Sequence, residues 1–311
     1  MANKRPQTDI GSLYKPMTKL IMGGYMVLTA NAVPRSKGNK CLIIHADDLG
    51  MCHSINAATF YASHVGAITS ASVMVPCAWF REVVHYAKAH PEFDLGVHLT
   101  LTSEWSNIRW RPITNVAKDS ALIDLDGFFC SNGKSLKLVR EDLISSELHA
   151  QITTCLESGL RPTHIDSHMF ALFTSSALYR VYLRLANTFN IPCLNWPFLM
   201  ASSTLENTDT SIIRGVDRQY QAPKSLNHSD WMEFYLDTIM SLSDGINQLT
   251  VHLGYDDDEL RAAMGADTFW GSSWRRRDLA VITSRRFRMA LEQRGVSLIG
   301  WQEIATRWSS A

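Results

Sequence analysis

The chain of 311 residues has no long apolar run, no Cys-x-x-Cys pair and no excess of charge of either sign. No apolar stretch is long enough to cross a bilayer, so we expect no membrane span. Lys and Arg number 30, and so do Asp and Glu, which gives a formal net charge of zero. Because no dense basic run is present either, the composition argues against nucleic acid and against an anionic membrane surface as partners.

The cysteines are few and scattered, which argues against a disulfide framework and against a thiolate zinc site. We interpret most of them as buried free thiols that pack as small hydrophobic side chains. The six are Cys41, Cys52, Cys77, Cys130, Cys155 and Cys193.

Residues 1–38 are set apart as a leader. A basic stretch at 15–19 precedes a mostly apolar stretch at 20–33 that ends near Ala30-Asn31-Ala32, a weak signal-peptide shape with Met17 as an alternative start. The other interpretation is a disordered segment. We predict a cytoplasmic protein with a single domain over residues 39–311, exported or periplasmic only if the leader is a signal peptide.

Strand-like and helix-like segments alternate along that domain, which predicts a parallel sheet with outer helices. Both a (β/α) barrel and a doubly wound sheet fit this pattern. No Gly-x-Gly-x-x-Gly follows the first strand, which argues against a dinucleotide-binding fold and favours the barrel. The expected strands cover 42–50, 70–76, 94–101, 161–168, 191–196, 247–254 and 296–301. The expected helices cover 55–65, 79–90, 141–158, 175–189, 229–242 and 275–293, with long loops at 103–139, 197–226 and 256–274.

Several of these strands end in side chains that can bind a metal. They are Asp47 and Asp48 on the first strand, His98 on the third, His164, Asp166 and His168 on the fourth, and His252 on the sixth. Carboxyl ends of parallel strands meet at one rim, and residues two apart on a strand share a face. Imidazole and carboxylate suit Zn, Fe, Mn, Co or Ni, and two histidines with one carboxylate form a typical hydrolytic site. Taken singly, each histidine is as well explained by a structural hydrogen bond.

Tryptophans in the long loops are a second feature of the same rim. Each one could simply pack in the core, but together they could stack on sugar rings above the site. They are Trp105, Trp110, Trp196, Trp270 and Trp274.

Four motifs, in order and spacing, resemble those of the YdjC-like carbohydrate deacetylases, also called the ChbG/HpnK type. They lie at 42–50, 96–101 (Gly-Val-His-Leu-Thr-Leu), 162–168 (Pro-Thr-His-Ile-Asp-Ser-His) and 251–255 (Val-His-Leu-Gly-Tyr). The resemblance covers roughly residues 40 to 305. It implies a distorted (β/α), TIM-like barrel and metal-dependent removal of acetyl groups from N-acetylated sugars.

The resemblance also implies roles for individual residues. Asp48, His98 and His168 would bind one divalent ion, with zinc or magnesium expected. Asp47 would be the general base and His252 the general acid.

The remaining rim residues carry less definite expectations. Asp166 and His164 are candidates for supporting the ligands or the substrate, and for Asp166 a plain hydrogen bond at the strand end is an equal alternative.

The chain departs from the family pattern at three places. Met169-Phe170-Ala171 follows His168 where further histidines are common, and Leu253 stands where proline is common. His45 replaces a common asparagine. The expected metal ligands are retained, whereas the identity of the sugar is left open.

Two rival functions remain. A metal-dependent phosphoesterase would need a second metal or a basic phosphate clamp. The only basic cluster available for a clamp is Arg275-Arg276-Arg277, which we interpret as solvated or paired with Asp278. A non-catalytic carbohydrate-binding barrel is the other. As partners we expect a small carbohydrate and, as the candidate assembly, a homodimer.

Overall fold

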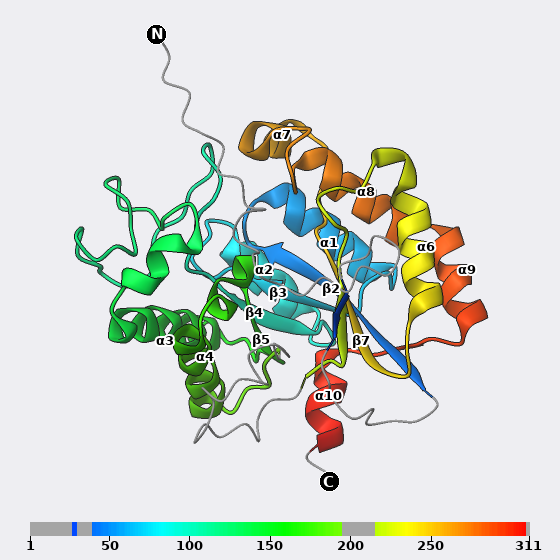
Figure 1. Cartoon of the computed structure of the whole chain (residues 1–311), viewed down its shortest axis with the longest axis horizontal. Helices are drawn as coiled ribbons and strands as arrows, with labels where there is room; N and C mark the ends of the chain where they lie inside the picture. The colour runs from blue at the N-terminus through cyan, green and yellow to red at the C-terminus, as the bar shows by residue number, and fades with distance from the viewer. Residues whose placement is uncertain (1–26, 30–38, 195–214, 309–311) are drawn as a thin grey trace.

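A computed structural model describes residues 27–29, 39–194 and 215–308. Its centre is an eight-stranded sheet in the order β1-β6-β7-β2-β3-β4-β5, with β8 paired to β2. All neighbours pair in parallel except β1 and β6. The sheet curls into part of a barrel with helices around it (Figure 1), which confirms the predicted distorted (β/α) barrel.

Most of the strands are short, and the ten-residue central strand β2 is buried over most of its length. Their bounds are β1 Val27–Thr29, β2 Lys40–Leu49, β3 Ser70–Val73, β4 Leu95–Leu99, β5 Ile165–Ser167, β6 Arg218–Tyr220, β7 Gly245–Val251 and β8 Ser297–Leu298. In β2 the run from Leu42 to Ile44 is at most 1% exposed. Such a run, apolar on both faces, suits a strand that is covered on both sides.

The helices form the outer layer of the barrel. The α-helices are α1 His53–His64, α2 Phe80–Ala89, α3 Glu141–Glu157, α4 Ser176–Phe189, α6 Trp231–Ser241, α7 Asp258–Met264, α8 Ser272–Ile282, α9 Arg285–Arg294 and α10 Trp301–Trp308. Short 3-10 helices lie at η2 Gly133–Leu138, η3 His168–Phe173 and η5 His228–Asp230. No helix in these described ranges has both the length and the apolar character that crossing a membrane needs.

Several elements differ from the sequence-based expectation. The helix expected over 275–293 is two helices, because Ser284 caps a new one by accepting a hydrogen bond from the Phe287 amide. The loop expected at 256–274 contains α7, which Asp257 caps in the same way. The stretch 197–226, expected to be irregular, contains β6. The described part of the strand expected at 191–196, residues 191–194, forms only a bridge between Cys193 and Ile165.

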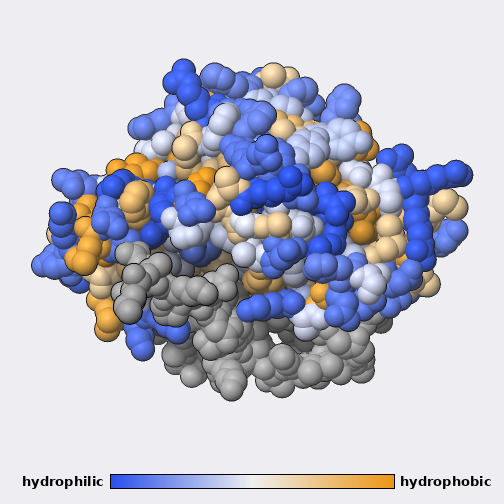
Figure 2. All heavy atoms as spheres, turned by 90° about the horizontal axis from the view of Figure 1, so that it is seen from above, coloured by the Kyte–Doolittle hydropathy of each residue, from blue (hydrophilic) through white to orange (hydrophobic). Residues whose placement is uncertain are grey.

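The cysteines agree with the prediction, since all six are free and five are buried. Residues 27–29 of the expected leader form β1, at the edge of the sheet. The bounds of the leader and of the single domain otherwise remain predictions. The expected homodimer also remains a prediction. On the face shown in Figure 2, polar side chains spread across the middle with apolar groups between them.

Candidate metal centre and active site

A pocket lies at the carboxyl ends of β2, β4, β5 and β7. Its walls include the predicted residues Asp47, Asp48, His98, His168, His252 and Trp270, together with Glu104, Ser167, Met169, Phe170, Gln221 and Arg275. Six non-glycine residues among those described have a positive φ angle, and four of them, Asp48, Met169, Phe170 and Trp270, line this pocket. Strained backbone of this kind concentrates at functional sites.

An irregularity in β2 explains how two adjacent carboxylates reach the same pocket. On a regular strand Asp47 and Asp48 would face opposite sides. The pairing of β2 with β3 shifts register between Ala46 and Leu49, and Asp48 adopts a φ of 72°. Aspartate tolerates this left-handed conformation better than most residues. The shift therefore turns both carboxylates towards the pocket.

Three side chains in the pocket are arranged as a metal-binding group. Asp48 Oδ1 lies 3.5 Å from His98 Nε2 and 3.3 Å from His168 Nδ1. All three residues are buried, and Asp48 Oδ1 has no hydrogen-bond partner. An unpartnered buried carboxylate oxygen is costly unless something else satisfies it. Two imidazole nitrogens and one carboxylate oxygen fit a divalent ion that keeps open positions.

The other polar atom of each of these three side chains is held by a different residue. His98 Nδ1 lies 2.7 Å from Asp166 Oδ1, and His168 Nε2 lies 3.0 Å from Glu104 Oε2. Asp166 thus orients His98 rather than His168. Since carboxylates only accept, each histidine donates from that nitrogen, and its other ring nitrogen faces Asp48, where a neutral ring could offer its lone pair to a metal.

Arg275 holds the carboxylate of Asp48, which corrects the expectation that it is solvated or paired with Asp278. Its side chain is buried and Nη2 donates to Asp48 Oδ2 over 2.7 Å. Burial would raise the pKa of Asp48, but Arg275 and the two histidines hold that pKa well below its usual range. The carboxylate is therefore ionised, as a metal ligand must be.

Asp47 and His252 face each other across the pocket. Asp47 Oδ2 lies 3.8 Å from His252 Nε2 and 4.0 Å from His98 Nε2. The His252 ring stacks on Trp270 with centroids 5.0 Å apart, and its backbone amide donates to Asp278. Burial lowers the pKa of His252 to about 4, more than Asp48 and Asp47 raise it, so its imidazole is neutral near pH 7.

His164 lies away from the pocket, contrary to the expectation that it would support the ligands or the substrate there. It precedes β5, and the two residue steps from Asp166 back to His164 place it about 6.6 Å deeper into the barrel. Its buried ring stacks on Trp301 at a centroid distance of 4.8 Å.

Of the expected tryptophans that the structure describes, only Trp270 lines the pocket. Trp110 is buried and donates to the Thr102 carbonyl, while Trp274 packs edge-on against Trp231. Trp105 is partly buried against the core. Trp105, Trp110 and Trp274 therefore do not line the pocket as expected, and Trp196 falls outside the described residues.

Sequence reasoning missed the contacts of Glu104, Arg275 and His45, and it noted His45 only as a departure from the family pattern. His45 Nε2 lies 3.2 Å from Asp47 Oδ1 and 3.0 Å from Asp166 Oδ2. The sequence offered one signal for such residues, a charged side chain between apolar or aromatic neighbours, as in Ser-Glu-Trp at 103–105. A charge in that setting can be buried, and a buried charge seldom lacks a partner.

Comparisons with known proteins agree with this geometry. The sequence matches a family described as YdjC-like protein over residues 41–293. A carbohydrate deacetylase of Enterococcus faecalis is 28% identical over 273 residues, covering 86% of this chain and 99% of that protein. A carbohydrate deacetylase of Thermus thermophilus is 33% identical over 237 residues, covering 72% and 81%.

A solved structure shares the fold. The crystal structure of an Enterococcus faecalis protein described as a candidate cellobiose-phosphate cleavage protein has a TM-score of 0.71 and 26% identity, and covers 86% of this chain and 99% of that one. With a family match across most of its length and the four motifs gathered at one rim, the chain belongs to the YdjC-like protein family.

Proposed function

We propose that this protein is a metal-dependent carbohydrate deacetylase that hydrolyses the acetamido group of N-acetylated sugars or oligosaccharides. The observation that carries the proposal is the unpartnered Asp48 Oδ1 facing His98 and His168. The names of the curated relatives support the same class of substrate. Zinc and magnesium are the ions we propose for the site.

The chemistry divides between the ion and two side chains. A divalent ion held by Asp48, His98 and His168 would supply Lewis acidity for the acetyl carbonyl and for water. Asp47 has one oxygen bound by His45 and the other facing the pocket, which suits a general base that takes the proton of the attacking water.

His252 is placed to move that proton to the leaving nitrogen. Because the resting ring is neutral, it first has to receive a proton, and Asp47 Oδ2 at 3.8 Å is the donor within reach. The amine then takes the proton from His252 as the C–N bond breaks. One proton thus passes from water to Asp47, to His252 and to the product.

The pH profile tests this order of proton transfer. A His252 that had to start as imidazolium would lose activity as the pH rose through its pKa of about 4, or through about 6.5 if the pKa were ordinary. A ring that starts neutral imposes no such loss. We expect kcat/KM to hold steady between about pH 6 and 8. A decline centred near 6.5 that disappears in His252→Gln would contradict the order.

The rival functions fit the geometry less well. The phosphoesterase lacks its clamp, because the guanidinium of Arg275 is buried against Asp48. A non-catalytic binding barrel would not explain Asp47 and His252 facing each other over the metal ligands. Acetate release from N-acetylated mono- and oligosaccharides, with and without a chelator, decides between the three. Release that the chelator abolishes supports the deacetylase, and no release from any of these sugars refutes it.

A matched pair of variants tests the contact with the sugar. Trp270 lines the pocket and Trp274 lies in the core, so Trp270→Phe should raise KM several-fold while Trp274→Phe should leave KM unchanged. The Trp274 indole nitrogen has no partner, so only packing is lost there. Steady-state kinetics and thermal melting of both variants provide the measurement. Equal KM values in the two would remove Trp270 from substrate binding.

A further inference from the structure

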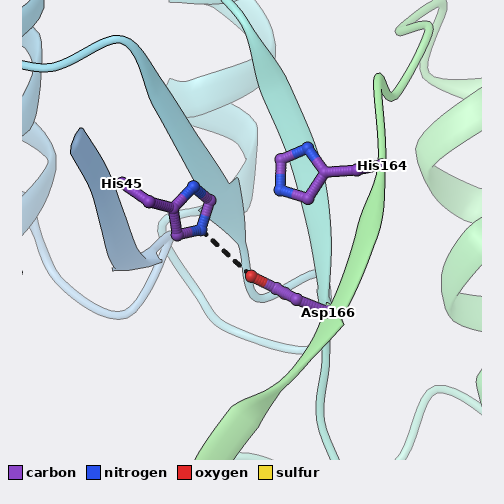
Figure 3. Close-up of side chains that lie close together, drawn as sticks. All are labelled: His45, His164 and Asp166. Carbon is purple, nitrogen blue, oxygen red and sulfur yellow. Dashed lines mark hydrogen bonds and ion pairs between the residues drawn. The ribbon is translucent and has the colours of Figure 1, made fainter. Parts of the chain in front are cut away.

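Beneath the metal-binding group lies a second buried group of polar side chains, formed by His45, His164 and Asp166. Figure 3 shows His45 extending from β2 and Asp166 from β5, with the imidazole directed at the carboxylate. All three are at most 3% exposed. His45 is the only one of them that also contacts the proposed base, since its Nε2 lies 3.2 Å from Asp47 Oδ1. The contacts of His45 therefore connect this buried group of side chains to the pocket.

The hydrogen bonds around His45 require a proton on both ring nitrogens. Ser70 donates its hydroxyl proton to Asp94 over 3.0 Å, so its oxygen accepts from His45 Nδ1 at 3.2 Å. His45 Nε2 faces Asp166 and Asp47, whose carboxylates can only accept. A ring that donates from both nitrogens is an imidazolium.

The surrounding charges agree with this protonation state. Burial works to lower the pKa of His45, but the hydrogen bonds to Asp166 and Asp47 outweigh it and raise that pKa to about 9. Four carboxylates line or support the site: Asp47, Asp48, Glu104 and Asp166. Arg275 and a divalent ion would supply three positive charges. His45 supplies the fourth, so the buried site becomes neutral, which limits the cost of burying its charges.

We propose that His45 is a positioning residue for the deacetylation proposed above: anchored on Asp166 and Ser70, it holds Asp47 with one carboxylate oxygen turned towards the substrate. Binding of Asp47 Oδ1 by His45 leaves Oδ2 facing His252 at 3.8 Å and His98 at 4.0 Å. Without that contact the carboxylate could rotate. A base displaced by about 1 Å can cost on the order of 10²-fold in rate.

The same group of side chains could instead be a second metal site. The ligand atoms of His45, His164 and Asp166 lie within 4.8 Å of one another, and His164 Nε2 has no hydrogen-bond partner. A metal would need a lone pair on His45, yet its hydrogen bonds leave none. The observations therefore favour a positioning role, and metal stoichiometry separates the two.

The same substitution at two neighbouring histidines provides the test. His45 and His164 are both fully buried, with ring centroids 5.0 Å apart, but only His45 contacts Asp47. We expect His45→Gln to lower kcat about 10²-fold, with KM within about threefold and one bound ion per chain retained. His164→Gln should destabilise the fold to a similar degree while kcat falls less than about threefold. Equal losses of kcat in the two variants, loss of the ion from His45→Gln, or two ions per chain in the wild type would overturn the proposal.

A spectroscopic measurement on the wild-type protein is independent of activity and of variant folding. At about pH 8 a histidine with an ordinary pKa is neutral, and histidines bound to a metal are neutral as well. Ring ¹⁵N NMR of the metal-loaded chain should then show a doubly protonated imidazole that is assigned to residue 45 by through-bond correlation. A neutral His45 at that pH overturns the positioning role, whereas a wild type that releases no acetate refutes only the proposed function.

The hydroxyl of Ser70 provides a smaller perturbation. Ser70→Ala removes one anchor of His45 with almost no change in packing volume, so this variant should fold even if His45→Gln does not. We expect kcat to fall roughly threefold to tenfold, with metal content and KM unchanged. A wild-type kcat in Ser70→Ala, together with an unchanged His45 ring signal, would show that this anchor has no role.

Discussion

Elemental analysis of His98→Ala and His168→Ala should find chains that have lost their divalent ion, and neither variant should release acetate. Each substitution removes one of the two imidazole nitrogens that lie within 3.5 Å of Asp48 Oδ1. It also removes an imidazole that donates to a supporting carboxylate, Asp166 for His98 and Glu104 for His168. Changes one step away from a metal already weaken binding about 10–100-fold, so direct loss of a ligand should exceed that range.

A graded control separates ligand loss from general destabilisation. Glu104→Gln keeps the size of the side chain but can no longer provide a carboxylate for His168 Nε2, so metal affinity should fall about 10–100-fold without vanishing. Titration of the metal-free protein with zinc or magnesium measures this affinity directly. Full metal content in both alanine variants would show that the ion is held elsewhere.

The local pattern of residues was enough to predict the elements that place this site. The apolar run that forms β2 ends in two carboxylates, His98 lies near the end of β4, and His252 directly follows β7. Because parallel strands present their carboxyl ends on one rim, strand order along the chain predicts which side chains meet. That reasoning brought Asp47, Asp48 and His98 together without any knowledge of the loops.

The residues that support the ligands could not be predicted in this way. Arg275 and Asp48 are 227 positions apart, and Glu104 is 64 positions from His168. Their pairing depends on how a long loop and a helix fold back over the rim, which no period of two or 3.6 residues describes. Arg275 lies in a run of three arginines, where only burial, invisible in the sequence, distinguishes it from its neighbours.

Depth along a strand is another property that the pattern does not contain. His164 and His168 share a face with Asp166, yet one ring is packed on Trp301 inside the barrel and the other reaches the pocket. The prediction that the tryptophans line the site failed for a related reason. A loop of apolar and aromatic residues can cover a rim or fold inward, and burial of a large ring favours the second outcome.

The second prediction of large effect concerns Asp47 and Asp48. Substitution of these two neighbouring carboxylates should impair the protein in different ways. Asp48→Asn replaces the oxygen that faces both histidines and weakens the pairing with Arg275, so the ion should be lost. Asp47→Asn should keep the ion, since Asp47 Oδ2 is 4.0 Å from His98 Nε2 and the ligand set is complete without it. Its rate should nevertheless fall about 10²–10⁴-fold, the usual contribution of a general base.

Metal content and single-turnover rates measured on the same preparations distinguish these outcomes. An Asp47→Asn chain with a full complement of metal and a slow chemical step would establish that the turn in β2 gives two adjacent aspartates two separate tasks. The φ of 72° at Asp48 is what makes this division possible, because it brings the second carboxylate to the histidines while the first stays on His45. Equal loss of metal in both variants would mean that the pair binds the ion jointly, and the base would then have to be sought elsewhere in the pocket.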